Sequence, residues 1–340
     1  MRARLVDVAR LAGVSPKTVS NVVNGYVHVS PEMRTRVRDA IAELSYVPNN
    51  TARTLRTGRT GILALALPNL SVPYFAELAR HVTTAAAERG FTILIDQTEG
   101  LESRERKIAS GLRNHVIDGL IFSPLAMGVA DIVEAAGETP MVLLGEREHP
   151  ASTDHVAIDN IAAATTATRH LLDLGRRRVA AVGAPVDTDC GTGALRLAGY
   201  RSALTAACLP DDGRLIVETS HFHRGEGERA TNRLLDLDEP PDAIFCFNDL
   251  LALGSLFALR QRGLRVPDDV AVVGFDDIEE SRYSHPTLTS ISPDKQRIAA
   301  TAVALLVDRL SGQRDDASAE VFVDYELVAR ESTTGQAARA

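Results

Sequence analysis

The segment from residue 17 to residue 24 carries short polar and basic side chains that suit contact with nucleic acid. If this segment is helical, one outer face near its N-terminal end holds Lys17, Thr18, Ser20, Asn21 and Asn24. Side chains of these types hydrogen-bond base edges and phosphate oxygens when a helix lies in the major groove of DNA. Each alone is more typical of a solvated helix face, so the hypothesis of DNA binding depends on the elements that position them.

Residues that start and end helices predict a helix-turn-helix around this segment. Apolar residues at helical spacing indicate a first helix, which Gly13 ends: Leu5, Val8, Ala9, Leu11 and Ala12. Ser15 and Pro16 then provide a cap and a first-turn proline for a second helix, with Val19, Val22 and Val23 as its expected apolar face. Ser30 and Pro31 repeat the signal for a third helix, which adds Val37, Ile41 and Leu44 to a small core. Two helices joined by a short glycine-containing turn are typical of this motif.

The distribution of charge separates the first sixty residues from the rest of the 340-residue chain. The whole chain holds 37 Lys and Arg against 45 Asp and Glu, and this net charge of −8 argues against a polyanionic partner. Residues 1–60, however, hold ten basic and four acidic residues, a net of +6, which leaves −14 for the remaining 280. Such asymmetry is typical of a nucleic-acid-binding module joined to an acidic body, although a chance cluster of solvated arginines gives the same count.

Residues 45–60 read SYVPNNTARTLRTGRT and predict a short helix with an asparagine cap and an end at Gly58. So short a helix is unstable alone in water and should order only against a partner or DNA. Leu55 is an isolated apolar side chain among three arginines, and minor-groove binders use such a residue as a wedge between base steps. An exposed linker leucine is the alternative, and the pattern alone does not choose between them.

From Gly61 onward, short apolar runs alternate with amphipathic stretches, which indicates parallel sheets covered by helices on both faces. The runs are GILALAL, FTILIDQ, GLIFSP and MVLLG, followed by RVAAVGA, AIFCFND and VAVVGFDD. Two similar sets, before and after about residue 158, predict two doubly wound lobes.

Ligands of such sheets lie beyond the carboxyl ends of the strands, so the residues there are candidates for ligand binding. In the first set they are Tyr74, Phe75, Asp96, Gln97 and Ser123. In the second set they are Asp187 or Asp189, Arg196, Phe222, Asn248 and the pair Asp276 and Asp277. Polar groups of these types beside aromatic rings commonly hold a hydroxylated or cyclic ligand in a cleft between domains, although each alone is more often a cap or turn residue.

No motif assembles a nucleophile, a base and an orienting group, so we expect no enzyme. Gly191-Thr192-Gly193 begins like a dinucleotide fingerprint, but Arg196 stands where the third glycine is required. His221 and His223 have no neighbouring cysteine or third histidine to complete a metal site. Three widely spaced cysteines, the lack of a membrane-length apolar run and the polar interruptions near the N-terminus predict a cytoplasmic protein without a membrane partner. A secreted solute-binding receptor of similar two-lobed fold is the alternative, but residues 1–60 would have no place in it.

Motifs along nearly the whole chain resemble those of the LacI/GalR family of bacterial transcription regulators. They are VDVARLAGVSPKTVSNVVNG, YVPNNTARTLRTGRTG, IDGLIFSP, VAIDN, FCFND, VVGFDD and LVARESTT. The resemblance implies that Pro16, Lys17 and Asn21 read bases and that Thr18, Ser20, Asn24 and His28 contact phosphates. It places Asn49, Ala52, Arg53 and Leu55 in a hinge helix that enters the minor groove. It also implies effector contacts for Arg196, Phe222, Asn248 and Asp276, with Phe75 and its neighbours on the wall of the first lobe.

Two departures from the family pattern bear on these roles. Many members carry Arg where this chain has Asn21, and because Asn prefers adenine while Arg prefers guanine, the half-site should differ at that base. The segment Ser292-Pro293-Asp294 replaces a frequent Arg-Gln-Pro sequence, and we assign it no role.

The expected architecture is a small all-α helix-turn-helix head joined to an α/β body of two doubly wound parallel-sheet lobes. The resemblance implies the periplasmic-binding-protein-like fold for that body, with a chain that crosses back between the lobes near residues 286–291. The domains are expected at 1–46 (DNA binding), 47–60 (hinge helix and linker) and 61–340 (effector binding and dimerisation). The lobes are expected at about 61–158 with 289–317, and at about 159–288 with 318–332.

The expected function is regulation of transcription, most readily as a repressor. A homodimer would bind a near-palindromic DNA operator, because twofold symmetry of the protein matches twofold symmetry of the site. The closing segment has no leucine heptads, so we expect no tetramer-forming tail. A small-molecule effector between the lobes would control operator affinity, with a sugar or sugar derivative favoured and a purine or nucleoside second. No cofactor or metal is expected.

Overall fold

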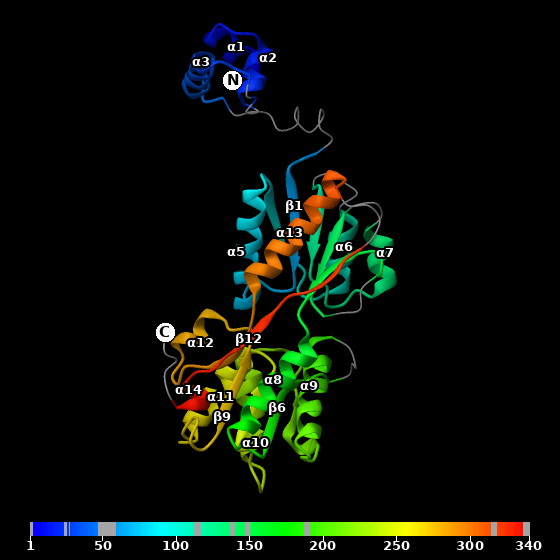
Figure 1. The fold of residues 1–340 in the computed structure, drawn as a ribbon, viewed down its shortest axis with the longest axis vertical. Coiled ribbons are helices and arrows are strands. Elements are labelled where there is room, and N and C mark those ends of the chain that lie inside the picture. The colour runs from blue at the N-terminus through cyan, green and yellow to red at the C-terminus, as the bar shows by residue number, and fades with distance from the viewer. Residues whose placement is uncertain are drawn as a thin grey trace. The chain divides into compact units, whose positions relative to one another are not determined.

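The computed structural model describes residues 3–23, 26, 28–46, 59–111, 117–136, 140–146, 150–186, 191–313 and 318–335. It divides the chain into two compact units, Met1–Thr60 and Gly61–Ala340 (Figure 1).

The first unit contains the three predicted helices, α1 (Leu5–Ala12), α2 (Pro16–Val23) and α3 (Pro31–Glu43). Their shared core is made of small apolar side chains from all three helices, among them Val8, Val19 and Val37, each fully buried. The predicted helix-turn-helix is therefore confirmed, but Leu11 and Val23 are exposed rather than part of the core. Leu11 lies outside the stripe formed by the buried residues of α1, and Val23 is the last residue of α2.

The second unit contains two six-stranded sheets, as the alternating pattern predicts. The first sheet has the order β11-β5-β4-β3-β1-β2 and is parallel throughout: β1 (Ile62–Leu67), β2 (Thr92–Gln97), β3 (Gly119–Phe122), β4 (Met141–Leu144), β5 (Asp154–Ala157) and β11 (Glu320–Phe322). The second has the order β12-β10-β9-β8-β6-β7: β6 (Val179–Ala184), β7 (Ile216–Glu218), β8 (Ala243–Cys246), β9 (Ala271–Phe275), β10 (Thr289–Pro293) and β12 (Tyr325–Val328). Only β12 runs antiparallel to its neighbour, β10.

Helices surround each sheet, which explains why its central strands are almost continuously buried. Beside the first sheet lie α5 (Pro73–Glu88), α6 (Glu102–Gly111), α7 (Val129–Ala136) and α13 (Lys295–Ser311) (Figure 1). With the second sheet lie α8 (Asn160–Asp173), α9 (Thr192–Ala206), α10 (Arg224–Leu235), α11 (Asp249–Gln261), α12 (Glu279–Tyr283), α14 (Glu331–Thr334) and the 3₁₀ turn η2 (Gly213–Leu215). The helices α10 and α11 approach so closely that a Cβ on Gly227 would lie 2.0 Å from the Leu251 carbonyl oxygen.

The lobe boundaries differ from the expected ones. Residues Thr289–Pro293 pair in parallel with β9 and so belong to the second lobe, which moves the return crossing to the link between β10 and α13. Residues Glu320–Phe322 pair in parallel with β5, so the final crossing follows β11 rather than preceding it. Hydrogen-bonded pairing between strands decides both boundaries. The sequence of a short strand does not reveal which strand it pairs with.

The edge strand β2 is largely exposed, in contrast to the buried centre of its sheet. Leu94 and Ile95 are 52% and 40% exposed. Within the described segments, no helix is both long enough and apolar enough to cross a membrane.

Candidate functional site

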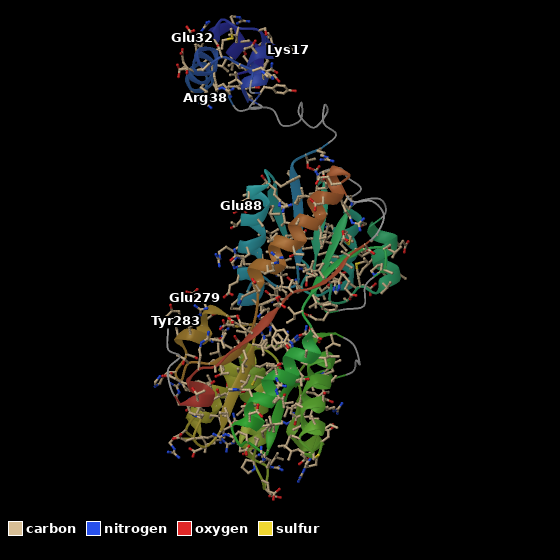
Figure 2. The ribbon with its side chains drawn as sticks, in the orientation of Figure 1. Lys17, Glu32, Arg38, Glu88, Glu279 and Tyr283 are labelled. Atoms are coloured by element: carbon tan, nitrogen blue, oxygen red, sulfur yellow. The ribbon has the colours of Figure 1, made fainter. Side chains whose placement is uncertain are left out.

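The start of α2 is capped as the sequence predicts. Ser15 Oγ accepts a hydrogen bond from the Thr18 backbone N–H at 3.1 Å, and the two hydroxyls are 2.9 Å apart. Val19 and Val22 face the core, so the opposite face of α2 is accessible. On it, Lys17 (Figure 2) and Pro16 are exposed, and Thr18, Ser20 and Asn21 are half-buried.

The turn between α1 and α2 is held by Gly13 and an arginine from α3. Gly13 has φ +64°, and the Arg36 guanidinium donates to the carbonyl oxygens of Ala12 and Gly13. A Cβ on Gly13 would lie 2.6 Å from Arg36 Nη2, so a larger residue would both strain the backbone and displace this contact. Arg36 thus contributes to the geometry that presents α2.

The remaining candidates for DNA contact lie partly beyond the described part of the chain. His28 is exposed in the turn before α3. The residues Asn24, Asn49, Ala52, Arg53 and Leu55 lie outside the described residues.

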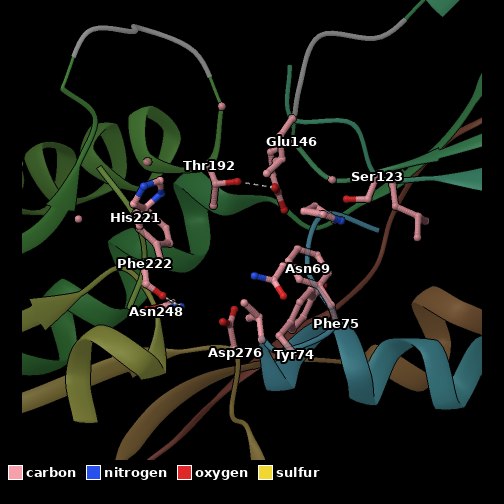
Figure 3. A pocket seen from close by; sticks show the side chains of 18 of the residues that line it. Asn69, Tyr74, Phe75, Ser123, Glu146, Thr192, His221, Phe222, Asn248 and Asp276 are labelled. Atoms are coloured by element: carbon pink, nitrogen blue, oxygen red, sulfur yellow. Dashed lines mark hydrogen bonds between the residues drawn. The ribbon is translucent and has the colours of Figure 1, made fainter. Parts of the chain in front are cut away.

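The second unit contains a cavity of about 1100 Å³ that is lined by both lobes. It brings together all eight candidate effector-binding residues: Tyr74, Phe75, Gln97, Ser123, Arg196, Phe222, Asn248 and Asp276 (Figure 3). These side chains come from the last residues of parallel strands, from the loops that follow them and from the helices that begin there, which is the position the strand-end argument predicts.

The wall formed by the first lobe combines aromatic rings with polar groups. Tyr74 and Phe75, in the first turn of α5, meet edge to face with ring centroids 5.3 Å apart. Burial raises the pKa of the Tyr74 hydroxyl, with a smaller contribution from neighbouring carboxylates. Gln97 Oε1 accepts from the Leu70 backbone N–H at 3.0 Å and so holds the loop that precedes α5. Gln97 therefore supports this wall as well as facing the cavity.

Arg196 is the buried cation of the second-lobe wall. Its Nε donates to Asn160 Oδ1 at 2.8 Å, Nη1 donates to the Phe247 carbonyl, and the guanidinium carbon lies 3.4 Å from the centroid of the Phe275 ring. Burial lowers the pKa of Arg196, while the carboxyl of Asp276, 3.9 Å from Nη2, acts in the opposite direction. Two protein acceptors and one aromatic ring thus hold the guanidinium in place, independently of any ligand.

Asp276 faces Arg196 from the end of β9. Burial raises the pKa of its carboxyl to about 8, although Arg196 acts in the opposite direction. At neutral pH the carboxyl is therefore mostly protonated and can both donate and accept a hydrogen bond. Its backbone has φ +109°, a left-handed conformation that is strained for a residue other than glycine.

Phe222 and Asn248 are connected to each other. The Asn248 side chain caps α11 by accepting from the Leu251 N–H at 2.9 Å, and its Nδ2 donates to the Phe222 carbonyl at 3.4 Å. Asn248 therefore caps a helix, which is the common alternative to ligand binding for a residue of this type, and it also lines the cavity.

Some candidates named from strand ends do not line the cavity. Asp277 pairs with Arg330, with Nη2 and Oδ1 2.6 Å apart, and accepts from the Ser292 hydroxyl at 3.1 Å. Asp96 accepts from the backbone N–H of its neighbour Gln97. Asp187 and Asp189 lie outside the described residues.

The cavity also contains polar residues that sequence reasoning missed. Glu146 follows β4, and its Oε2 accepts from the Thr192 hydroxyl of the other lobe at 2.7 Å (Figure 3). Asn69, His221 and His223 line it as well. Glu146 comes just after the run MVLLG, so applying the strand-end rule to the fourth strand would have found it. Within the described part of the chain, no group of three or more His, Cys, Asp or Glu side chains is arranged to hold a metal ion.

Comparison with known proteins gives matches to both units. Residues 4–49 match the model for bacterial regulatory proteins of the lacI family, and residues 168–333 match that for a periplasmic binding protein-like domain. The HTH-type transcriptional regulator CelR of Thermobifida fusca is 37% identical and covers 97% of this chain and 98% of its own length.

Two solved structures are similar along almost the full length. A complex of transcriptional regulator CelR with cellobiose has a TM-score of 0.72 at 34% identity and covers 97% of this chain and 100% of its own. A lac repressor dimer bound to operator and the anti-inducer ONPF has a TM-score of 0.84 at 27% identity, with coverages of 98% and 99%.

Proposed function

The chain belongs to the LacI family of bacterial regulatory proteins and is a DNA-binding transcription regulator with an effector-binding domain, and we propose that it is a repressor released by a neutral saccharide. The resemblance noted from its motifs is thereby confirmed. The observation that carries the effector assignment is the cavity between the lobes, with its aromatic walls, carboxyl groups and protein-bound arginine.

The charges of the cavity favour a neutral ligand over an anionic one. Three carboxyl-bearing residues, Glu99, Glu146 and Asp276, line it. The hydrogen bonds of Arg196 Nε and Nη1 go to protein acceptors. A phosphate or carboxylate ligand would therefore meet the carboxyl oxygens of Glu99 and Glu146 without a free guanidinium fork. Sugar hydroxyls both donate and accept, so they match these oxygens and the protonated Asp276 carboxyl alike. The rings of Tyr74, Phe75 and Phe222 supply flat apolar surfaces for pyranose faces, and the complex of CelR with cellobiose supports a disaccharide.

For the DNA side, we propose the domain division 1–46, 47–60 and 61–340, with base contacts from Pro16, Lys17 and Asn21. Exposure of Lys17 and the accessible face of α2 support this assignment. Phosphate contacts by Thr18, Ser20, Asn24 and His28, and minor-groove contacts by the hinge residues, remain predictions based on the family.

We propose that the protein acts as a homodimer, and the similar lac repressor, a dimer in its complex with operator, supports this. Apolar side chains that are exposed on both lobes support dimerisation through the second unit, Gly61–Ala340. Leu94 and Ile95 are exposed on β2, and Tyr283 (Figure 2) is 78% exposed on α12. Tyr283 and Leu253 line the same shallow hollow. Large exposed apolar groups of this kind commonly mark interfaces.

A single experiment with two stages tests this proposal. Operator sequences are selected from random DNA with the full-length chain, and their binding is then titrated with cellobiose, ribose, a sugar phosphate and hypoxanthine. We expect a near-palindromic operator and release by a neutral saccharide. Selection of no symmetric site would contradict operator binding, release only by hypoxanthine would favour the purine alternative, and tightened binding would show a co-repressor.

A further inference from the structure

A largely buried lysine lies behind the cavity wall, where the two lobes meet. Lys295 is the first residue of α13, beside the first sheet, and its side chain is only 11% exposed. Its Nζ donates to two carbonyl oxygens of the second lobe, those of Asp276 at 2.7 Å and Asp277 at 2.9 Å. Nζ also lies 5.9 Å from the centroid of the Tyr74 ring on the first-lobe wall. Lys295 itself is not among the residues that line the cavity.

Glu77 completes this connection from α5. One of its oxygens lies 2.6 Å from Lys295 Nζ, and the other accepts from the Glu279 backbone N–H at 2.9 Å. Glu279 begins α12 of the second lobe, immediately after the loop that carries Asp276 (Figure 2). Glu77 stands one turn beyond Tyr74 in the same helix. Its ion pair with Lys295 therefore links the aromatic wall to the loop that carries the Asp276 carboxyl.

The loop held in this way needs support from outside itself. Asp276 and Asp277 have φ of +109° and +44°, left-handed conformations that cost free energy in residues other than glycine. Such backbone persists only where neighbouring groups determine it. From the second lobe, Asp249 Oδ2 accepts from the Ile278 N–H at 3.0 Å and from the Ser281 hydroxyl at 2.6 Å. Lys295 and Glu77 supply the corresponding contacts from the first lobe.

We propose that Glu77 and Lys295 are positioning residues that join the lobes behind the cavity and hold the Asp276 carboxyl in the orientation in which it meets ligand. The carbonyl oxygens of Asp276 and Asp277 accept from Lys295 only while the backbone of these two residues is left-handed. Removal of the lysine ammonium group therefore removes the first-lobe contacts that hold the loop in this conformation. Ligand affinity then falls without loss of any side chain that touches the ligand. The inference rests on the proposed function only for the ligand that Asp276 meets, and not for the connection itself.

Hydrogen exchange of the full-length protein tests the connection without any ligand. In Lys295→Met, amides 278–281 should exchange about ten- to hundredfold faster, the range expected for loss of hydrogen bonds to a charged group. The amides of β8 and β9 should be unchanged, which also shows that the variant is folded. Glu77→Gln should give a smaller increase, and the double variant should resemble Lys295→Met rather than adding the two effects.

The matched control is Glu280→Gln, which removes a carboxylate from the same short helix. Glu280 pairs with Arg224 at 3.4 Å where both side chains are about half exposed. Equal exchange at residues 278–281 in Lys295→Met and Glu280→Gln would overturn the proposal.

A second measurement separates positioning from general stability. Cellobiose binding by Lys295→Met should weaken about tenfold, while affinity for the selected operator in the absence of sugar stays unchanged. Unchanged cellobiose affinity, or a parallel loss of operator affinity, would contradict the positioning role. Absence of cellobiose binding by the wild type would refute the disaccharide assignment, and the exchange result would still decide the role of the two residues.

Discussion

The raised pKa of Asp276 should make the stability of this protein depend on pH in a characteristic direction. The folded chain keeps the proton up to about pH 8, whereas the unfolded chain loses it near the ordinary value of 3.8. Between these values the folded state binds more protons, so the free energy of unfolding falls as pH rises, by about 1.4 kcal/mol per pH unit. From pH 5 to pH 7, this one group should remove about 3 kcal/mol of stability.

Asp276→Asn tests this reasoning because an amide has the shape of the protonated carboxyl and does not titrate. Urea-induced unfolding of the full chain, followed by circular dichroism at pH 5, 6, 7 and 8, gives the free energy for wild type and variant. Groups remote from Asp276 titrate alike in both, so the difference between the curves reports Asp276 together with its coupling to neighbours such as Asp249. We expect the variant to gain on wild type as pH rises. Glu88→Gln, at an exposed end of α5, is the control and should follow wild type. Parallel curves for wild type and Asp276→Asn would refute the buried, protonated carboxyl.

Four further changes test individual assignments. Asn21→Arg should shift the selected operator toward guanine at one symmetric position, with a discrimination of about 1–3 kcal/mol, and identical selected sequences would show that Asn21 reads no base. Gly13→Ala should destabilise the first unit by about 1–3 kcal/mol, since it strains a residue at φ +64° and meets Arg36, and unaltered thermal unfolding and operator affinity would contradict this. Arg196→Ala should retain operator binding, measured by mobility shift, and lose release by cellobiose; a normal response would show that the cavity is misassigned. Leu55→Ala should reduce operator bending, measured by energy transfer between DNA ends, while cellobiose affinity stays intact; unchanged bending would remove the wedge hypothesis.

Residue pattern was sufficient to predict the parts of this fold that depend on local signals. Ser15 and Ser30 are caps where they were expected, and each strand named from a long apolar run is present. Such features follow from one segment of chain and its burial. The short strands β7, β11 and β12 have no comparable run, because an edge strand is stabilised by pairing with a neighbour that lies far away in sequence.

The candidate site was predictable for a topological reason, and the missed residues show the limit of that reason. Carboxyl ends of parallel strands meet at one edge of each sheet, so Gln97 and Ser123 converge in the first lobe, and Asn248 and Asp276 in the second, although long segments separate them. Glu77 lies in α5, well beyond the end of β1, and Lys295 comes two residues after β10, a strand that no long apolar run marks in the sequence. Both lie behind the wall, in positions set by how α5 and α13 meet the second lobe. No spacing rule relates a residue to an element of the opposite lobe, so only three-dimensional structure could reveal this pair.

Several residues that face the cavity also hold its walls in place, and this affects how substitutions should be interpreted. Gln97 fixes the loop before α5, Asn248 caps α11, and Arg196 satisfies two acceptors of the second lobe. Removing Asn248 or Arg196 leaves buried partners unpaired, and removing Gln97 releases the loop before α5, so each change costs stability whether or not a ligand is present. Loss of effector response in such variants is therefore evidence of ligand contact only when unfolding shows that the second unit is intact. Asp276→Asn is more informative than truncation at these positions, because it keeps the shape of the protonated carboxyl and changes only its ability to ionise.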